Sequence, residues 1–138
     1  QSLTILNRNV EKAQNLASDV SGSGLISDVK ADSISEIGNY LANADILVDT
    51  TPIGMHPNII DEPIAFAEDM HEDLAVFDAV YNPNETVLLK EAIKAGAKPV
   101  YGIKMLLYQG AESFKIWTGR DAPVDVMEKA LKDTLSLE

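Results

Sequence analysis

The run Ile46-Leu47-Val48-Asp49-Thr50-Thr51-Pro52-Ile53-Gly54-Met55 carries the clearest fold signal in this sequence. It begins with apolar residues typical of a strand and breaks at Pro52, which has no amide to donate to a sheet. Gly54 then favours a turn. Ligands of open α/β sheets sit beyond the carboxyl ends of the strands. We therefore predict a central strand whose functional edge lies at residues 50–55. A buried strand followed by an ordinary turn is the alternative on these residues alone.

The composition is that of a globular domain with a real core. The chain has 138 residues, of which 46% are hydrophobic and 24% charged. Its net charge of −11 repels nucleic acid and anionic membranes, so neither is expected as a partner. The absence of cysteine excludes disulfides and thiolate metal sites and fits a cytoplasmic protein. We see no membrane-length apolar run and no secretory leader.

Strand-like and helix-like segments alternate along the whole chain. Strands are predicted at 3–6, 25–29, 46–50, 75–81 and 99–101. Helices are predicted at 10–20, 33–41, 64–70, 85–95, 103–118 and 123–137. This order predicts an α/β fold, a Rossmann-like doubly wound parallel sheet with helices on both faces, in a single domain spanning 1–138.

Local signals define several helix ends and faces. Asn9 is expected to cap the first helix, and Ser33 with Glu36 has the spacing of a capping box. Apolar residues three and four positions apart predict buried helix faces that include Leu16, Ile93 and Trp117.

Arg8 is the first residue that indicates a ligand. It lies in Asn7-Arg8-Asn9, at the tip of a predicted strand and before a helix. In dinucleotide-binding sheets an acid at the tip of the second strand accepts the NAD ribose hydroxyl, whereas an arginine accommodates the NADP 2′-phosphate. The free amides of the following helix would add to such a site. An arginine exposed to solvent is the alternative, and the commoner one on these residues alone.

The glycine-rich turn that should accompany such a site is missing. A G-x-G-x-x-G turn belongs between the first strand and its helix. Nothing of the kind precedes residue 3, and Gly22-Ser23-Gly24 follows a helix instead. Either the chain is not a dinucleotide fold, or its first β-α unit is absent.

The other polar candidates are weaker. Tyr81 and Gln109 could each bind a hydroxylated ligand, although an ordinary surface or half-buried polar residue is the commoner case for each taken separately. Asp78 lies inside a predicted strand, where a buried carboxylate needs partners, so we expect it to hold a neighbouring loop. His56 and His71 have no third ligand at a suitable spacing, so no metal site is predicted. No Ser/His/Asp pattern is present.

Four segments together match the motifs of one known family. Asn7-Arg8-Asn9 with Lys12 resembles an Asn-Arg-Thr motif that grips the NADP 2′-phosphate, and the run from Asp49 to Met55 resembles an Asn-Ala/Thr-Thr-Pro-x-Gly-Met signature. Residues 78–83 resemble a segment with a substrate-contacting tyrosine, and residues 102–119 resemble the closing helix. The chain thus resembles the nucleotide-binding half of shikimate dehydrogenase nearly end to end.

The resemblance implies reversible, NADPH-dependent reduction of 3-dehydroshikimate to shikimate. It implies that NADP is the cofactor and that it is bound by Asn7, Arg8, Asn9, Lys12, Thr51, Ala79, Gly102 and Met105. It also implies that Tyr81 and Gln109 contact the substrate. The family's catalytic Lys–Asp pair belongs to an amino-terminal substrate domain with no counterpart here, so no catalytic residue is assigned in this chain.

Three residues depart from the family pattern. Asn9 replaces a threonine, a mild change because both residues can cap the helix and donate to phosphate. Asp49 replaces an asparagine. Lys104 stands where a second glycine is usual, and could crowd the nicotinamide or add charge beside it.

The missing β-α unit has a structural consequence. In the strand order 3-2-1-4-5-6 the absent first strand is the central one, so the strands at 3–6 and 46–50 should each expose an unpaired edge. We expect a fragment of a longer enzyme that is completed by the substrate domain. Direct pairing of those two strands would contradict this. A homodimer is compatible with the sequence. Two alternatives stay open: a quinate/shikimate dehydrogenase with relaxed cofactor choice, and a non-catalytic nucleotide-binding module.

Overall fold

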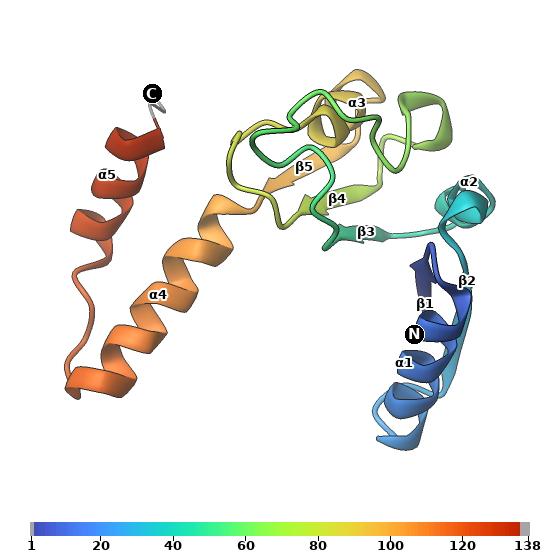
Figure 1. The fold of residues 1–138 in the computed structure, drawn as a ribbon, viewed down its shortest axis with the longest axis horizontal. Coiled ribbons are helices and arrows are strands. Elements are labelled where there is room, and N and C mark those ends of the chain that lie inside the picture. The colour runs from blue at the N-terminus through green and yellow to red at the C-terminus, as the bar shows by residue number, and fades with distance from the viewer. Residues whose placement is uncertain (1, 136–138) are drawn as a thin grey trace. The chain divides into compact units, whose positions relative to one another are not determined.

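The structure is a computed structural model that describes residues 2–135 and alternates strands with helices (Figure 1). It divides into two compact units, Gln1–Ala44 and Asp45–Glu138. Every strand pair in the described residues is parallel, which confirms the predicted α/β class. The assignment of 1–138 to a single domain stays a prediction, and each unit is described by itself.

The first unit is a β-α-β arrangement followed by short helical turns. Its elements are β1 (Ser2–Asn7), α1 (Val10–Gly22), β2 (Asp28–Ser33), the 3-10 helix η1 (Ile34–Glu36) and α2 (Ile37–Leu41). β1 and β2 are in parallel register, with Leu3 beside Val29, and α1 packs against both strands. The buried side chains of this unit are Ala13, Ala17, Ile37 and Leu41.

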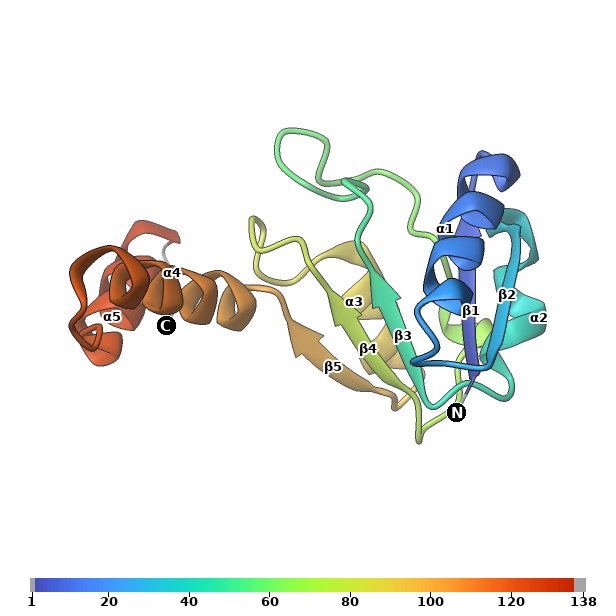
Figure 2. The same ribbon diagram turned by 90° about the horizontal axis from the view of Figure 1, so that it is seen from below.

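The second unit contains a three-stranded parallel sheet in the order β3-β4-β5 (Figure 2). Its elements are β3 (Ile46–Asp49), the 3-10 helix η2 (Ala67–Asp69), β4 (Ala75–Asp78), α3 (Val87–Lys94), β5 (Lys98–Tyr101), α4 (Ile103–Thr118) and α5 (Val124–Leu135). α3 packs against β4 and β5, and α4 packs against α5. Fully buried side chains in this unit include Leu74, Val76, Leu89 and Ala92.

Both sheets have a strand with an unpaired edge. In the first unit β1 pairs with β2 along one edge, and in the second unit β3 pairs with β4 along one edge, which leaves the other edge of β1 and of β3 unpaired within its own sheet. The missing central strand stays a prediction. In the three-stranded sheet, α3 lies on the face that carries Val76 and Asp78. The opposite face exposes Ile46, Val48 and Val100 by 63%, 56% and 44%, although parallel sheets are normally covered on both faces.

Three predicted elements need correction. The strand predicted at 25–29 is β2, which starts only at Asp28, because Gly24 turns the chain at φ +72° and pairing with β1 begins after it. The strand predicted at 75–81 ends at Asp78, whose carboxylate accepts the Val80 amide and bends the chain. The helix predicted at 64–70 is only the short turn η2. Its Asp69 carboxylate accepts the amide of Phe66, the residue just before the turn.

The helix signals were partly right. Asn9 caps α1 as predicted, because its side-chain oxygen accepts the Lys12 amide at 3.2 Å. The capping box is wrong, since the Ser33 hydroxyl accepts from Ser35 and the Glu36 carboxylate from an asparagine. The predicted burial is also wrong for three side chains that are largely exposed, namely Leu16, Ile93 and Trp117. α4 has the predicted bounds, and α5 agrees with its prediction over the residues that the structure describes.

Candidate functional site

The turn after β3 is held by a buried aspartate. Asp49 is 2% exposed, and its Oδ1 accepts the Thr51 amide at 2.7 Å. The Thr51 hydroxyl accepts the Ile53 amide at 3.3 Å, and the Met55 amide donates to the Pro52 carbonyl at 3.2 Å. These hydrogen bonds define the backbone at the predicted functional edge.

The turn after β4 is built in the same way. Asp78 is fully buried; its Oδ1 accepts the Val80 amide at 2.9 Å, and its Oδ2 accepts the Thr86 hydroxyl at 2.6 Å. Thr86 in turn caps α3 by accepting the Leu89 amide at 3.3 Å. The predicted structural role of Asp78 in holding a neighbouring loop is confirmed. The importance of Thr86 was missed, although a threonine just before an apolar helical run is a recognisable N-cap signal.

Both carboxyl groups resist ionisation. Burial raises the pKa of Asp78, although its hydrogen bonds from Thr86 and Val80 oppose the shift. Burial also raises the pKa of Asp49, the bonds from Thr51 oppose it, and the charge of Asp78 raises it further. At this edge of the sheet, ionisation of one carboxyl group therefore makes ionisation of the other less favourable.

Gly102 brings the start of α4 against the end of β4. A Cβ atom at Gly102 would lie 2.6 Å from the Asp78 carbonyl oxygen and 2.7 Å from that of Ala79. Real Cβ atoms do not approach a carbonyl oxygen so closely, so only glycine fits. The Ala79 amide donates to the Asp49 carbonyl at 2.9 Å, which joins the ends of β3 and β4. Ala79 and Gly102 are thus brought together by backbone packing.

The remaining predicted residues of this unit are exposed, except for Thr51. Met105 is 50% exposed in the first turn of α4, and Gln109 lies one turn later on the same helix and is also exposed. Tyr81 is 40% exposed just beyond the turn held by Asp78. Thr51, on the turn after β3, is half-buried.

The residues predicted to bind the 2′-phosphate lie together in the first unit. Asn7 Oδ1 accepts the Asn9 amide at 2.9 Å, and Asn9 caps α1, so the loop between β1 and α1 is ordered by its own side chains. Arg8 and Lys12 are exposed on this loop and on the first turn of α1. Among residues 2–135, no hydrogen bond or ion pair engages the Arg8 guanidinium. The donor set of a guanidinium, an ammonium and amides is suited to a phosphate monoester.

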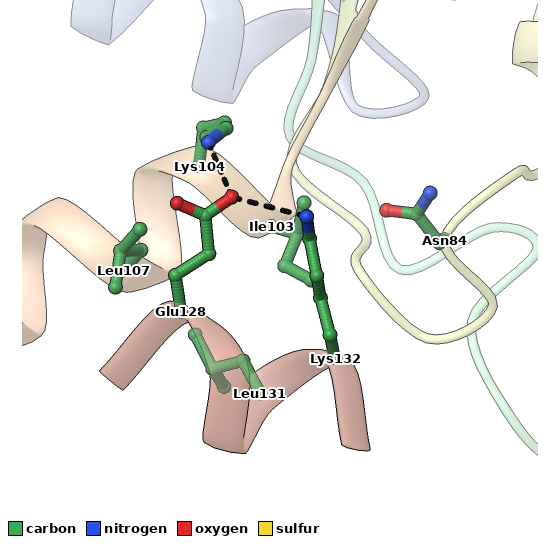
Figure 3. A pocket seen from close by; sticks show the side chains of 7 residues that line it. All are labelled: Asn84, Ile103, Lys104, Leu107, Glu128, Leu131 and Lys132. Carbon is green, nitrogen blue, oxygen red and sulfur yellow. Dashed lines mark hydrogen bonds and ion pairs between the residues drawn. The ribbon is translucent and has the colours of Figure 1, made fainter. Parts of the chain in front are cut away.

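Lys104 is part of an ion-pair cluster that the sequence did not reveal (Figure 3). Its Nζ lies 2.8 Å from Glu128 Oε1, and Lys132 Nζ lies 3.5 Å from the same oxygen. The hydrogen bond that Lys104 donates to Glu128 lowers the pKa of Glu128 and raises the pKa of Lys104. The three side chains line a pocket of about 250 Å³ whose other lining residues are Asn84, Ile103, Leu107 and Leu131. Lys104 is thereby engaged with α5.

Neither a metal-binding cluster nor a membrane-spanning helix occurs within residues 2–135. No group of three or more His, Asp or Glu side chains within 2–135 could hold a metal ion. No helix in the same range has the length and apolar character needed to cross a membrane.

Comparison with known proteins gives one consistent family. Residues 1–78 match the family described as shikimate/quinate 5-dehydrogenase, and residues 102–132 match the shikimate 5′-dehydrogenase C-terminal domain. A shikimate dehydrogenase (NADP(+)) from Methanobrevibacter smithii is 66% identical over 137 residues, which are 99% of this chain and 49% of that protein. Another, from Methanothermobacter thermautotrophicus, is 55% identical over 97% of this chain and 47% of its own length.

Solved structures agree. A shikimate dehydrogenase in complex with NADP+ superposes with a TM-score of 0.88 at 43% identity, over 97% of this chain and 47% of that one. A quinate dehydrogenase from Corynebacterium glutamicum in complex with NAD gives a TM-score of 0.85 at 29% identity, over 99% of this chain and 47% of that one. These matches confirm the Rossmann-like fold. The chain spans about half the length of the relatives it matches, and it belongs to the shikimate/quinate 5-dehydrogenase family.

Proposed function

We propose that this chain is the NADP-binding portion of a shikimate dehydrogenase, which catalyses the reversible, NADPH-dependent reduction of 3-dehydroshikimate to shikimate. The observation that carries the proposal is the exposed Arg8 on a loop ordered by Asn7 and Asn9, at the N-terminus of α1. A shikimate dehydrogenase (NADP(+)) 66% identical over this chain supports the same cofactor.

The residues of this chain bind and orient the cofactor and the substrate. Arg8, with Asn7, Asn9 and Lys12, takes the 2′-phosphate. Four residues line the nicotinamide side: Thr51, Ala79, Gly102 and Met105. Tyr81 and Gln109 hydrogen-bond the substrate. The bound cofactor supplies the hydride, and no group in this chain is assigned to proton transfer.

The rest of the enzyme is the amino-terminal substrate domain that the family resemblance implies, and the relatives are about twice as long as this chain. The free edges of β1 and β3 and the exposed apolar face at Ile46, Val48 and Val100 support a missing strand and its covering helix. The absence of cysteine supports a cytoplasmic enzyme. A homodimer stays a prediction that light scattering on the whole protein would check.

The test is an assay of the whole protein that carries this sequence, with shikimate and NADP+, following NADPH absorbance. We expect Arg8→Ala to raise the KM for NADP+ at least tenfold while leaving that for NAD+ nearly unchanged, since only NADP+ carries the extra phosphate. Arg120→Ala is the matched control, because Arg120 is an exposed arginine in the second unit. Equal weakening of both cofactors by Arg8→Ala would refute the assignment of Arg8.

A second candidate is a quinate dehydrogenase that uses NAD, favoured by the similarity to the C. glutamicum structure. The absence of an acid in Asn7-Arg8-Asn9 argues against strong NAD use. Turnover of quinate with NAD+ that exceeds turnover of shikimate with NADP+ would select this alternative. A whole protein that binds NADP+ and turns over neither substrate would instead be a non-catalytic module.

A further inference from the structure

Asp49 and Asp78 occupy equivalent positions on neighbouring strands. Each is the last residue of its strand, and the two are direct partners in the parallel register of β3 and β4. Partners in a parallel register point to the same face of the sheet, here the face covered by α3. The two carboxyl groups are therefore neighbours.

The two side chains also make the same kind of hydrogen bond. Each accepts the amide two residues further on, at 2.7 Å for Asp49 and 2.9 Å for Asp78, and each is almost wholly buried. Two carboxylates that share a buried site cannot both ionise without a large cost, so one of them holds its proton more tightly.

We propose that Asp49 and Asp78 form a coupled carboxyl pair in which Asp49 retains its proton while Asp78 is charged, and that loss of this proton, by placing two charges side by side in the buried edge, disturbs the turns carrying Thr51 and Tyr81. Both carboxyl groups accept hydrogen bonds, but those of Asp78 fall on both of its oxygens, from the Val80 amide on Oδ1 and from the Thr86 hydroxyl on Oδ2 at 2.6 Å. We assign the charge to Asp78 because such bonds stabilise a carboxylate and because the charge of Asp78 raises the pKa of Asp49. The effect on cofactor and substrate rests on the proposed function, whereas the pair itself does not.

The charged groups on the neighbouring elements do not offset the repulsion between the two carboxyl groups. Tyr101 is the in-register neighbour of Asp78 on β5, and its phenol adds no positive charge. On α3, Glu91 accepts the Ala67 amide at 2.9 Å and lies 3.5 Å from Lys94, so both are engaged elsewhere, and Lys90 is exposed. Within residues 2–135, the charge of Asp78 thus acts on Asp49 without an opposite charge paired to it, in agreement with the raised pKa of Asp49.

The sign of the pH dependence follows. The pKa of Asp49 is higher in the folded state than in the unfolded state, so the bound proton contributes to the free energy of unfolding. This contribution is complete below the unfolded-state pKa and is lost as the pH rises through the folded-state pKa. Deprotonation therefore destabilises the folded edge of the sheet. An asparagine at position 49 keeps the acceptor for Thr51 and removes the titration.

The first experiment is a carbon-13 NMR titration of the aspartate carboxyl carbons in the whole protein. We expect Asp78→Asn to lower the pKa of Asp49, and Asp45→Asn to leave it unchanged. Asp45 is a matched control because it is exposed at the other end of β3. An Asp49 titration that is identical in wild type and Asp78→Asn would overturn the pair. The wild-type titration curves test the coupling independently. If both carboxyl carbons show the same two titration steps, the two groups are coupled, whereas a single step for each carbon would overturn the coupling.

The second experiment measures NADPH affinity by fluorescence across the titration of Asp49. We expect the wild-type Kd to rise several-fold with pH and that of Asp49→Asn to stay flat. Parallel pH profiles in the two proteins would overturn the positioning role. A wild-type protein that binds no NADPH at any pH would refute the proposed function, and the NMR titration would still decide the carboxyl pair.

Discussion

Replacing Thr86 by valine tests the hydrogen bonds that fix the edge of the second unit. Thr86 is 1% exposed, and valine has nearly the same shape, so the substitution removes the hydroxyl with little change in packing. The hydroxyl donates to Asp78 Oδ2 at 2.6 Å and accepts the Leu89 amide at 3.3 Å. Both partners are buried and would be left unsatisfied.

The expected loss has two parts. An N-cap residue is worth about 1 kcal/mol. A buried acceptor that loses its donor costs about 1–3 kcal/mol. Thr86→Val should therefore lower the free energy of unfolding by about 2–4 kcal/mol. Denaturant unfolding of the whole protein, followed by circular dichroism, measures the difference.

Thr86→Ser is the matched control for that variant. Serine keeps the hydroxyl and loses one buried methyl group, which costs about 1 kcal/mol. The valine variant should thus be the less stable of the two. If Thr86→Val is at least as stable as Thr86→Ser, the hydrogen bonds to Asp78 and Leu89 are not what holds this turn.

Three smaller perturbations test other parts of the structure. Gly102→Ala should destabilise the protein by about 3 kcal/mol or more, because its Cβ would lie 2.6 Å from a backbone carbonyl oxygen; Gly22→Ala, with open space around it, is the control, and equal melting temperatures would refute the close approach. Asn9→Ala should cost about 1 kcal/mol through loss of the α1 cap, and an unchanged unfolding midpoint would count against it. Glu128→Gln should reduce stability at neutral pH only slightly, since the pair with Lys104 is exposed. Because the folded-state pKa of Glu128 is lowered, the difference should vanish as the pH falls through it, and a difference that persists in acid would exclude the ion pair as its cause.

Local signals predicted a large part of this fold. The Asn9 cap and the bounds of α4 were correct because a cap and an amphipathic helix depend on residues a few positions apart. The capping box at Ser33 failed since Ser35 offered a nearer amide donor to the same hydroxyl. The predicted burial of Leu16 and Trp117 was wrong. An apolar stripe predicts a helix face that can be buried, whereas burial itself requires a surface that packs against that face.

The sequence by itself determined the family, the order of strands and helices, and the grouping of Asn7, Arg8 and Asn9, since adjacent residues on a strand tip must lie together. Only the tertiary structure decided that Asp49 stands beside Asp78, that Gly102 touches the end of β4, and that Lys104 pairs with Glu128. Each of these pairs is separated by more than twenty residues along the chain. Strand register and helix packing bring such residues together, and they arise from the fit of whole elements rather than from any short run of sequence.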